Sequence, residues 1–76
     1  INPFTDKIKF SSSSKLENAV FTLFDISGRQ LKRWNNLTTE INEPVELSIN
    51  FPLTDGLYFV RIQSGGLFYT AKLIHN

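Results

Sequence analysis

The sequence predicts a small all-β domain, an antiparallel β-sandwich of immunoglobulin or fibronectin type III style with about six to seven strands. Short apolar-rich segments recur at roughly ten-residue spacing, with turn residues between them. No segment longer than a turn has the apolar spacing of a helix. Because a chain of 76 residues is short for more than one core, we expect residues 1–76 to form a single domain.

A predicted β-hairpin near the C-terminus organises the rest of the chain. Strand-forming residues dominate 57–63 and 67–74, and a Ser-Gly-Gly turn connects them. Alternation places on the inner face Tyr58, Val60, Ile62, Tyr69, Ala71 and Leu73. The opposite face then carries Phe59, Arg61, Phe68, Thr70 and Lys72. Since a lone hairpin is marginal in water, earlier segments must supply partner strands.

The chain begins with short elements. Residues 1–6 are predicted to be an extended lead-in, because the proline at position 3 disfavours a helix. Residues 7–10 alternate polar and apolar side chains, which predicts a short strand. The serine-rich residues 11–18 stand between two strand signals and are therefore interpreted as a loop.

A second hairpin is predicted over residues 19–34. Its first strand, 19–25, has apolar side chains on both faces, which fits either a central strand covered on both sides or a strand with one exposed apolar face. In the turn, Gly28 is the candidate for a left-handed backbone conformation. Asp25 is expected to accept hydrogen bonds from amides of its own turn, with a calcium site at Asp25 or Asp55 as the weaker alternative.

The middle of the chain is predicted to be a loop followed by a strand. Residues 35–43 are polar and rich in turn formers, with a short edge strand as the alternative. Their Asn-Leu-Thr triplet matches a glycosylation acceptor, a pattern that often arises by chance. Residues 45–51 have the cleanest alternation in the chain, and their inward set is Val45, Leu47, Ile49 and Phe51.

A corner is predicted at residues 52–56, just before the terminal hairpin. Tyr58 stands two residues after the corner glycine Gly56, which suits the tyrosine corner of immunoglobulin-like folds. The alternative is an ordinary core tyrosine with its hydroxyl group at the surface.

Composition argues against several classes of function. The net charge of +1, with scattered basic residues, disfavours a nucleic-acid partner. Without cysteine the chain has neither a disulfide nor the usual ligands of structural zinc. The only histidine, His75, is expected to be frayed and solvated, which leaves no catalytic base in view. We therefore predict a protein that is not an enzyme and needs no cofactor or metal.

The outer face of the terminal hairpin is the candidate docking patch. Phe59 and Phe68 are expected there beside Arg61, joined by Phe24 from the preceding hairpin. Exposed together, such rings rimmed by charge mark a protein-binding surface. Alternatively, the stems of the basic side chains cover the rings.

Segments in order along the chain resemble the C-terminal sorting domains of the type IX secretion system. They are Asn2-Pro3-Phe4, Leu-Phe-Asp-Ile-Ser-Gly-Arg at 23–29, Leu-Thr-Asp-Gly-Leu-Tyr-Phe-Val-Arg-Ile at 53–62, and Lys72-Leu73-Ile74. The resemblance covers nearly the whole chain. It is consistent with the missing methionine and the Ile-Asn-Pro start, which predict a piece of a longer protein.

The resemblance implies a non-catalytic export signal joined to an N-terminal cargo. After export to the periplasm, such a folded domain is recognised by a machinery that includes an outer-membrane translocon, a shuttle protein and a sortase. The cargo then reaches the cell surface or is secreted, and the sortase often removes the domain at a site upstream of it, here expected at or before Ile1.

The resemblance also assigns roles to individual positions. Lys72, Leu73 and Ile74 in the last strand are the residues most tied to recognition, and strand addition along the terminal edge is one way to read them. The hallmark turn positions are Asp25, Gly28, Arg29, Gly56 and Tyr58. Family members often end in a basic residue, whereas this chain ends in His-Asn. Exposed edges and a short hairpin also predict a strand-swapped homodimer.

The alternative function is a fibronectin-like spacer or a carbohydrate-binding accessory module of an extracellular enzyme. The segment around the 52–56 corner would serve that fold equally well. Carbohydrate platforms use exposed Trp or Tyr side chains, and Trp34 is the free candidate in this sequence.

Overall fold

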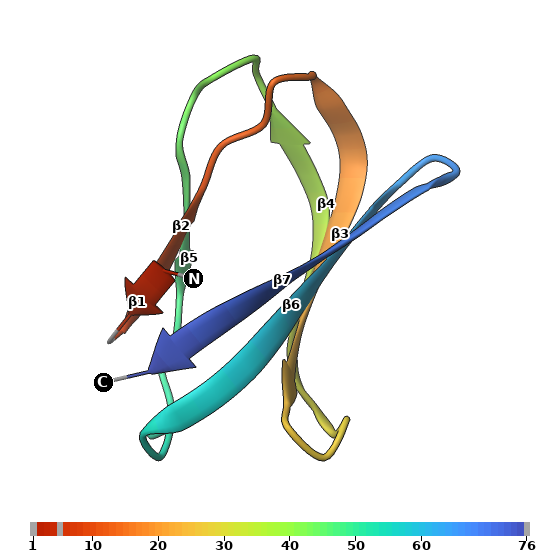
Figure 1. Cartoon of the computed structure of the whole chain (residues 1–76). Coiled ribbons are helices and arrows are strands. Elements are labelled where there is room, and N and C mark those ends of the chain that lie inside the picture. Colours follow the sequence, from red (N-terminus) through yellow and green to blue (C-terminus); the bar gives the residue numbers. More distant parts are fainter. Residues whose placement is uncertain (1, 5, 76) are drawn as a thin grey trace.

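The computed structural model describes residues 2–4 and 6–75, which form seven β-strands joined by turns and loops (Figure 1). The strands are β1 (Asn2–Phe4), β2 (Lys7–Phe10), β3 (Leu16–Asp25), β4 (Gln30–Thr39), β5 (Val45–Ser48), β6 (Gly56–Ser64) and β7 (Leu67–His75). The described residues include no helix, and so none that is long and apolar enough to cross a membrane. The all-β prediction is confirmed.

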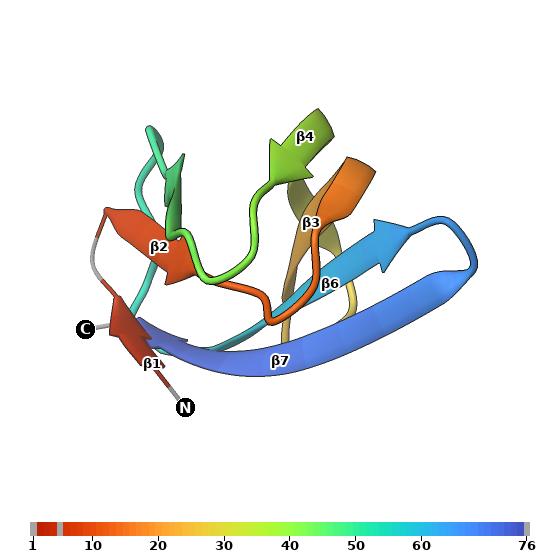
Figure 2. The ribbon, with the colours of Figure 1, turned by 90° about the horizontal axis from the view of Figure 1, so that it is seen from above.

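Two sheets face each other. The larger has the strand order β1-β7-β6-β3-β4, and the smaller pairs β2 with β5. Seen from above, the larger sheet is curved and the smaller one lies opposite only part of it (Figure 2). This arrangement confirms the β-sandwich. Neighbouring strands are antiparallel except β1 and β7, which are parallel, a pairing that the extended lead-in did not predict.

The core lies between the two sheets. Phe21 and Leu23 of β3 are fully buried, and the ring of Phe10 meets that of Phe21 edge-on with centroids 5.2 Å apart. Each fully buried side chain of this size contributes about 1.5–3 kcal/mol. The buried apolar residues are Ile8, Leu16, Ala19, Phe21, Leu23, Leu47, Ile49, Tyr58, Val60, Ile62 and Leu73.

β3 and β4 are both longer than the sequence predicts. β3 begins at Leu16, inside the predicted loop, and β4 continues to Thr39, which favours the edge-strand alternative for that polar segment. Asn18 and Asn36 interrupt the apolar alternation with φ angles of 50° and 57°, and the register shifts along this pair. Asparagine tolerates the left-handed conformation, so each strand continues through an irregularity that resembles a loop in sequence.

The segment after β4 returns to the second sheet. β5 is shorter than predicted, but Leu47 and Ile49 are buried and Val45 is half-buried, as their alternation requires. Beyond the strand end, the amide of Ile49 donates to the carbonyl of Asp6 over 2.7 Å. Of the predicted lead-in, residues 2–4 form β1, while residues 1 and 5 lie outside the described residues.

Candidate functional site

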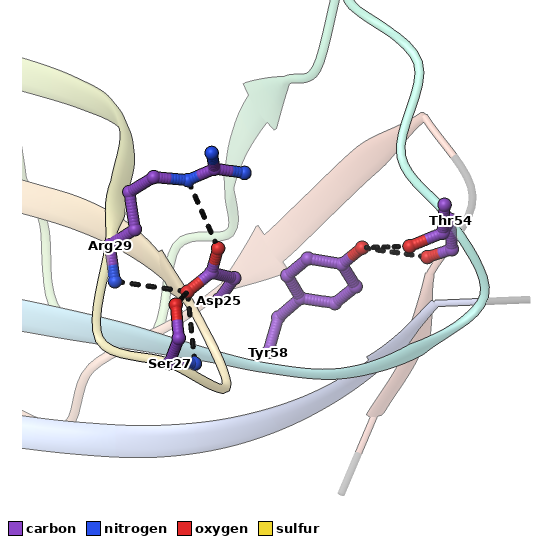
Figure 3. A network of polar contacts seen from close by, with 5 residues as sticks. All are labelled: Asp25, Ser27, Arg29, Thr54 and Tyr58. Atoms are coloured by element: carbon purple, nitrogen blue, oxygen red, sulfur yellow. Dashed lines mark hydrogen bonds and ion pairs between the residues drawn. The ribbon is translucent and has the colours of Figure 1, made fainter.

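The Asp25–Arg29 turn is held by one carboxylate. Asp25 Oδ1 accepts hydrogen bonds from the amides of Ser27 (3.0 Å) and Arg29 (2.9 Å) and from the Ser27 hydroxyl group (2.6 Å), while Oδ2 accepts one from Arg29 Nε (3.2 Å) (Figure 3). The Ser27 hydroxyl, the two amides and the Arg29 charge hold the pKa of Asp25 below its ordinary value. The structure thus confirms that Asp25 bonds amides of its own turn.

Gly28 completes this turn with a φ of 89°. Its amide donates to the carbonyl of Asp25, and the amide of Asp25 donates to the carbonyl of Arg29, both over 3.0 Å. Side chains other than glycine are strained at this φ, which explains the residue type. The predicted left-handed position is confirmed.

Tyr58 forms a tyrosine corner. Its hydroxyl group donates to the carbonyl oxygen of Thr54 over 2.7 Å and lies 3.2 Å from the Thr54 hydroxyl group (Figure 3). The tyrosine itself is 5% exposed, so its ring belongs to the core while its hydroxyl group fastens the chain that enters β6. This geometry decides in favour of the corner over an ordinary core tyrosine.

The two turns that the resemblance predicts as hallmarks lie at one end of the larger sheet. Asp25 and Tyr58 are register partners across β3 and β6, and Gly56 is the partner of His75 across β6 and β7. The five predicted turn positions are therefore brought together by strand pairing, although they come from separate parts of the chain.

The prediction that His75 is frayed and solvated is wrong. It closes β7, its side chain is 13% exposed, its Nδ1 lies 3.4 Å from Asp55 Oδ1, and its ring meets the Tyr58 ring edge-on at 6.2 Å. Pairing with β6 on one side and with β1 on the other keeps the strand ordered to this residue. The order of His75 could have been predicted from the hairpin register, because counting back from the turn makes His75 the partner of Gly56.

The last strand is exposed over most of its length. In β7 the first six residues are exposed, and only Leu73 is buried, at 3%. Of the predicted recognition residues, Lys72 is exposed, Leu73 contributes to the core and Ile74 is half-buried. Inner-face residues near the hairpin tip are exposed too, Tyr69 at 50% and Leu67 at 55%, because the smaller sheet does not reach over them.

One edge of β7 is largely open. β6 pairs with all of β7, but on the other side β1 pairs only with Leu73, Ile74 and His75. Among the described residues, no strand pairs with residues 67–72 along that edge. These residues bear a single charge, on Lys72, and no proline. An edge of this kind is a template for an added strand.

The candidate docking patch is only partly assembled. Phe24 and Phe59 are register partners on the outer face, and the Arg61 guanidinium lies 5.3 Å from the centroid of the Phe24 ring. With Thr70 they line a hollow of about 240 Å³. Phe68 does not join them, because it lies near the hairpin tip as the partner of Gln63. Both rings in the hollow are half-buried, and the Arg61 side chain lies over that of Phe24.

Metal binding and carbohydrate binding, the other two kinds of site that the sequence raises, have little support in the described residues. They contain no group of three or more His, Asp or Glu side chains that could hold a metal ion. Trp34, the candidate for a carbohydrate platform, is half-buried against the core, with Lys32 Nζ 5.7 Å from its ring centroid.

The comparisons with known proteins agree with the resemblance seen in the sequence. A family model described as a secretion system C-terminal sorting domain matches residues 2–76. Comparison with curated proteins and with solved structures found no match.

Proposed function

Because the chain belongs to the secretion system C-terminal sorting domains, we propose that it is a non-catalytic signal that directs a cargo, joined to its N-terminus, across the outer membrane. The family is that of the type IX secretion signals, whose members lead to export to the cell surface or to secretion. The match over residues 2–76 carries this proposal, since it spans both hallmark turns and the last strand.

The proposed route has several steps beyond that family-level function. The cargo passes through the periplasm with the domain folded, and the domain then meets the shuttle protein and the outer-membrane translocon. A sortase at the surface removes the domain upstream of residue 2. The rigid scaffold supports recognition in the folded state, because Asp25 and Tyr58 each fix a turn through side-chain hydrogen bonds.

We place recognition on β7. Lys72 is the exposed contact, and Leu73 holds the strand on the core so that its edge is presented in a fixed register. The open edge at residues 67–72 supports strand addition, in which main-chain hydrogen bonds give affinity and alternate side chains give specificity.

An export assay tests the proposal. A reporter protein carrying residues 1–76 at its C-terminus is expressed, behind a periplasmic export signal, in a Gram-negative bacterium with a type IX secretion system. We expect the reporter at the cell surface or in the medium, and its mass reports whether the domain has been removed. A reporter that stays in the periplasm would overturn the proposed function.

A pair of variants tests the role of the last strand. Deletion of residues 72–76 is expected to retain the reporter inside the cell. The substitution Tyr69→Lys, which adds a charge to the open edge without touching the buried core, is expected to lower export while the domain stays folded. The matched control is Ile41→Lys, an exposed apolar residue outside the larger sheet. Unchanged export by both the deletion and Tyr69→Lys would rule out recognition through β7.

A further inference from the structure

The outer face of the larger sheet is basic and aromatic. Strand register aligns Arg33, Thr22, Arg61 and Thr70 in one row across β4, β3, β6 and β7. The next row joins Phe24, Phe59 and Lys72 across β3, β6 and β7. These rows alternate with the buried residues of the inner face, so they point away from the core. They contain three cations and no carboxylate, on a chain whose net charge is only +1.

A hollow lies within this face, next to the Asp25–Arg29 turn. Its volume is about 240 Å³, and the rings of Phe24 and Phe59 line it together with Thr70 and the exposed Ile26. Arg61 is exposed and also lines the hollow, so its guanidinium presents a charge beside an apolar surface. In protein–protein interfaces, pockets receive the anchoring side chains of the partner.

Asp25 also lines the hollow, but the two oxygens of its carboxylate are already engaged. They accept hydrogen bonds from Ser27 and Arg29 and form an ion pair with Arg29 at 3.2 Å. Arg61, by contrast, is exposed, and its guanidinium lies over the Phe24 ring at 5.3 Å rather than on a carboxylate. The charge available to a ligand is therefore positive.

We propose that this hollow binds an apolar side chain flanked by carboxylates, on an acidic extended segment of a partner protein. The apolar side chain lies against Phe24 and Phe59, and a neighbouring carboxylate accepts hydrogen bonds from Arg61. Arg33 and Lys72 extend the positive surface on either side, which fits further acidic residues of the same segment. The inference deepens the proposed function, on which it rests for the partner being part of the secretion machinery.

Peptide titration tests the chemistry without the secretion machinery. The probes are acetyl-Gly-Asp-Leu-Asp-Gly-amide and its isostere with asparagine in place of both aspartates, each added to the 76-residue chain and followed by amide NMR shifts. We expect the acidic peptide to shift signals of Phe24, Phe59 and Thr70 and to bind about tenfold more tightly than the isostere, since a charged hydrogen bond is lost. Raised salt should weaken only the acidic peptide.

Two variants locate the site. Arg61→Gln is expected to remove the preference for the acidic peptide, and Lys9→Gln, an exposed cation on the smaller sheet, is the matched control and should keep it. Equal affinity for both peptides, an acidic preference that survives Arg61→Gln, or shifts confined to residues 67–69 would overturn the inference. Shifts at the hollow that grow with protein concentration alone would assign it to a second copy of the chain and would also overturn it.

The export assay separates this inference from the proposed function. If the reporter is exported but the peptide preference is missing, the inference fails and the proposed function stands. If the preference holds and depends on Arg61 but the unmodified domain exports nothing, the binding site stands and the proposed function fails.

Discussion

Asp25 and Tyr58 face each other across β3 and β6, and each side chain hydrogen-bonds a residue four positions away in its own turn. One reaches forward to Arg29 and the other back to Thr54, so a single rung of the sheet fixes two turns (Figure 3).

Removing the hydroxyl group of Tyr58 should destabilise the domain. Tyr58→Phe deletes the 2.7 Å bond to the Thr54 carbonyl and keeps the buried ring. We expect the free energy of unfolding to fall by about 0.5–1.5 kcal/mol, measured by urea denaturation. Tyr69→Phe, at a tyrosine that is 50% exposed, is the control and should change little. An equal loss in both variants would contradict a structural role for the corner.

The Asp25 network should make part of the stability depend on acid pH. Since folding lowers the pKa of Asp25 from 3.8, its contribution is fully present above pH 3.8 and is lost as the pH falls through the lower, folded-state pKa. Asp25→Asn should be less stable than the wild type at neutral pH, and this difference should shrink in that acid window. Thermal melts at a series of pH values measure this difference, and Glu43→Gln, at an exposed carboxylate, is the control. A difference that persists unchanged into acid would refute the assignment.

A side chain at position 28 should strain the turn. Gly28→Ala places a Cβ on a residue with φ of 89°, where space is open but the backbone conformation is unfavourable. We expect a loss of about 1–2 kcal/mol in unfolding free energy. Gly66→Ala is the matched control, because its surroundings are equally open and its φ is not in the left-handed range. If both variants melt alike, conformation is not the reason for glycine at position 28.

Truncating the central core residue should have the largest effect. Leu23 is 0% exposed between the two sheets, and Leu23→Ala removes its packing and leaves a cavity. Such changes lower the free energy of unfolding by about 2–5 kcal/mol, which is a large share of the total free energy of unfolding of a small domain. Leu67→Ala, at a residue 55% exposed, should cost far less in the same urea titration. In the export assay, Leu23→Ala should also retain the reporter, because recognition requires the folded domain.

A strand-swapped homodimer stays a prediction. The open edge of β7 and the short turn at residues 65–66 favour exchange of the last strand between two copies. Size-exclusion chromatography over a range of concentrations should then show a dimer that dissociates slowly on dilution. A single monomeric peak at every concentration would end this expectation.

Much of the fold could be predicted because its signals are local. The alternation around Leu47 and the turn chemistry of Asp25 and Gly28 depend on residues close in sequence, and the structure confirms each. The extensions of β3 and β4 could not be predicted in this way. Both strands continue through asparagines in left-handed conformations, Asn18 in β3 and Asn36 in β4. The extensions persist because β3 and β4 pair with each other along these residues.

The candidate site, too, has a part that the sequence predicts and a part that it does not. The terminal hairpin fixes the faces of Phe59 and Arg61 by alternation alone, so their placement was predictable. The separation of Phe68 from the hollow and the order of His75 both depend on the register of the hairpin, and β1, from the other end of the chain, also pairs with His75. Periodicity carries no information on either.

The parallel pairing of β1 with the end of β7 has a mechanical consequence. Asn2, Pro3 and Phe4 lie alongside Leu73, Ile74 and His75, so the tether to the cargo leaves the domain beside the strand proposed to be gripped. If the machinery holds β7 while the cargo resists movement, the resulting tension acts first on the short β1–β7 pairing, as shear, and only then on the buried core. β1 would then separate from β7 while the remaining strands stay folded and β7 stays bound.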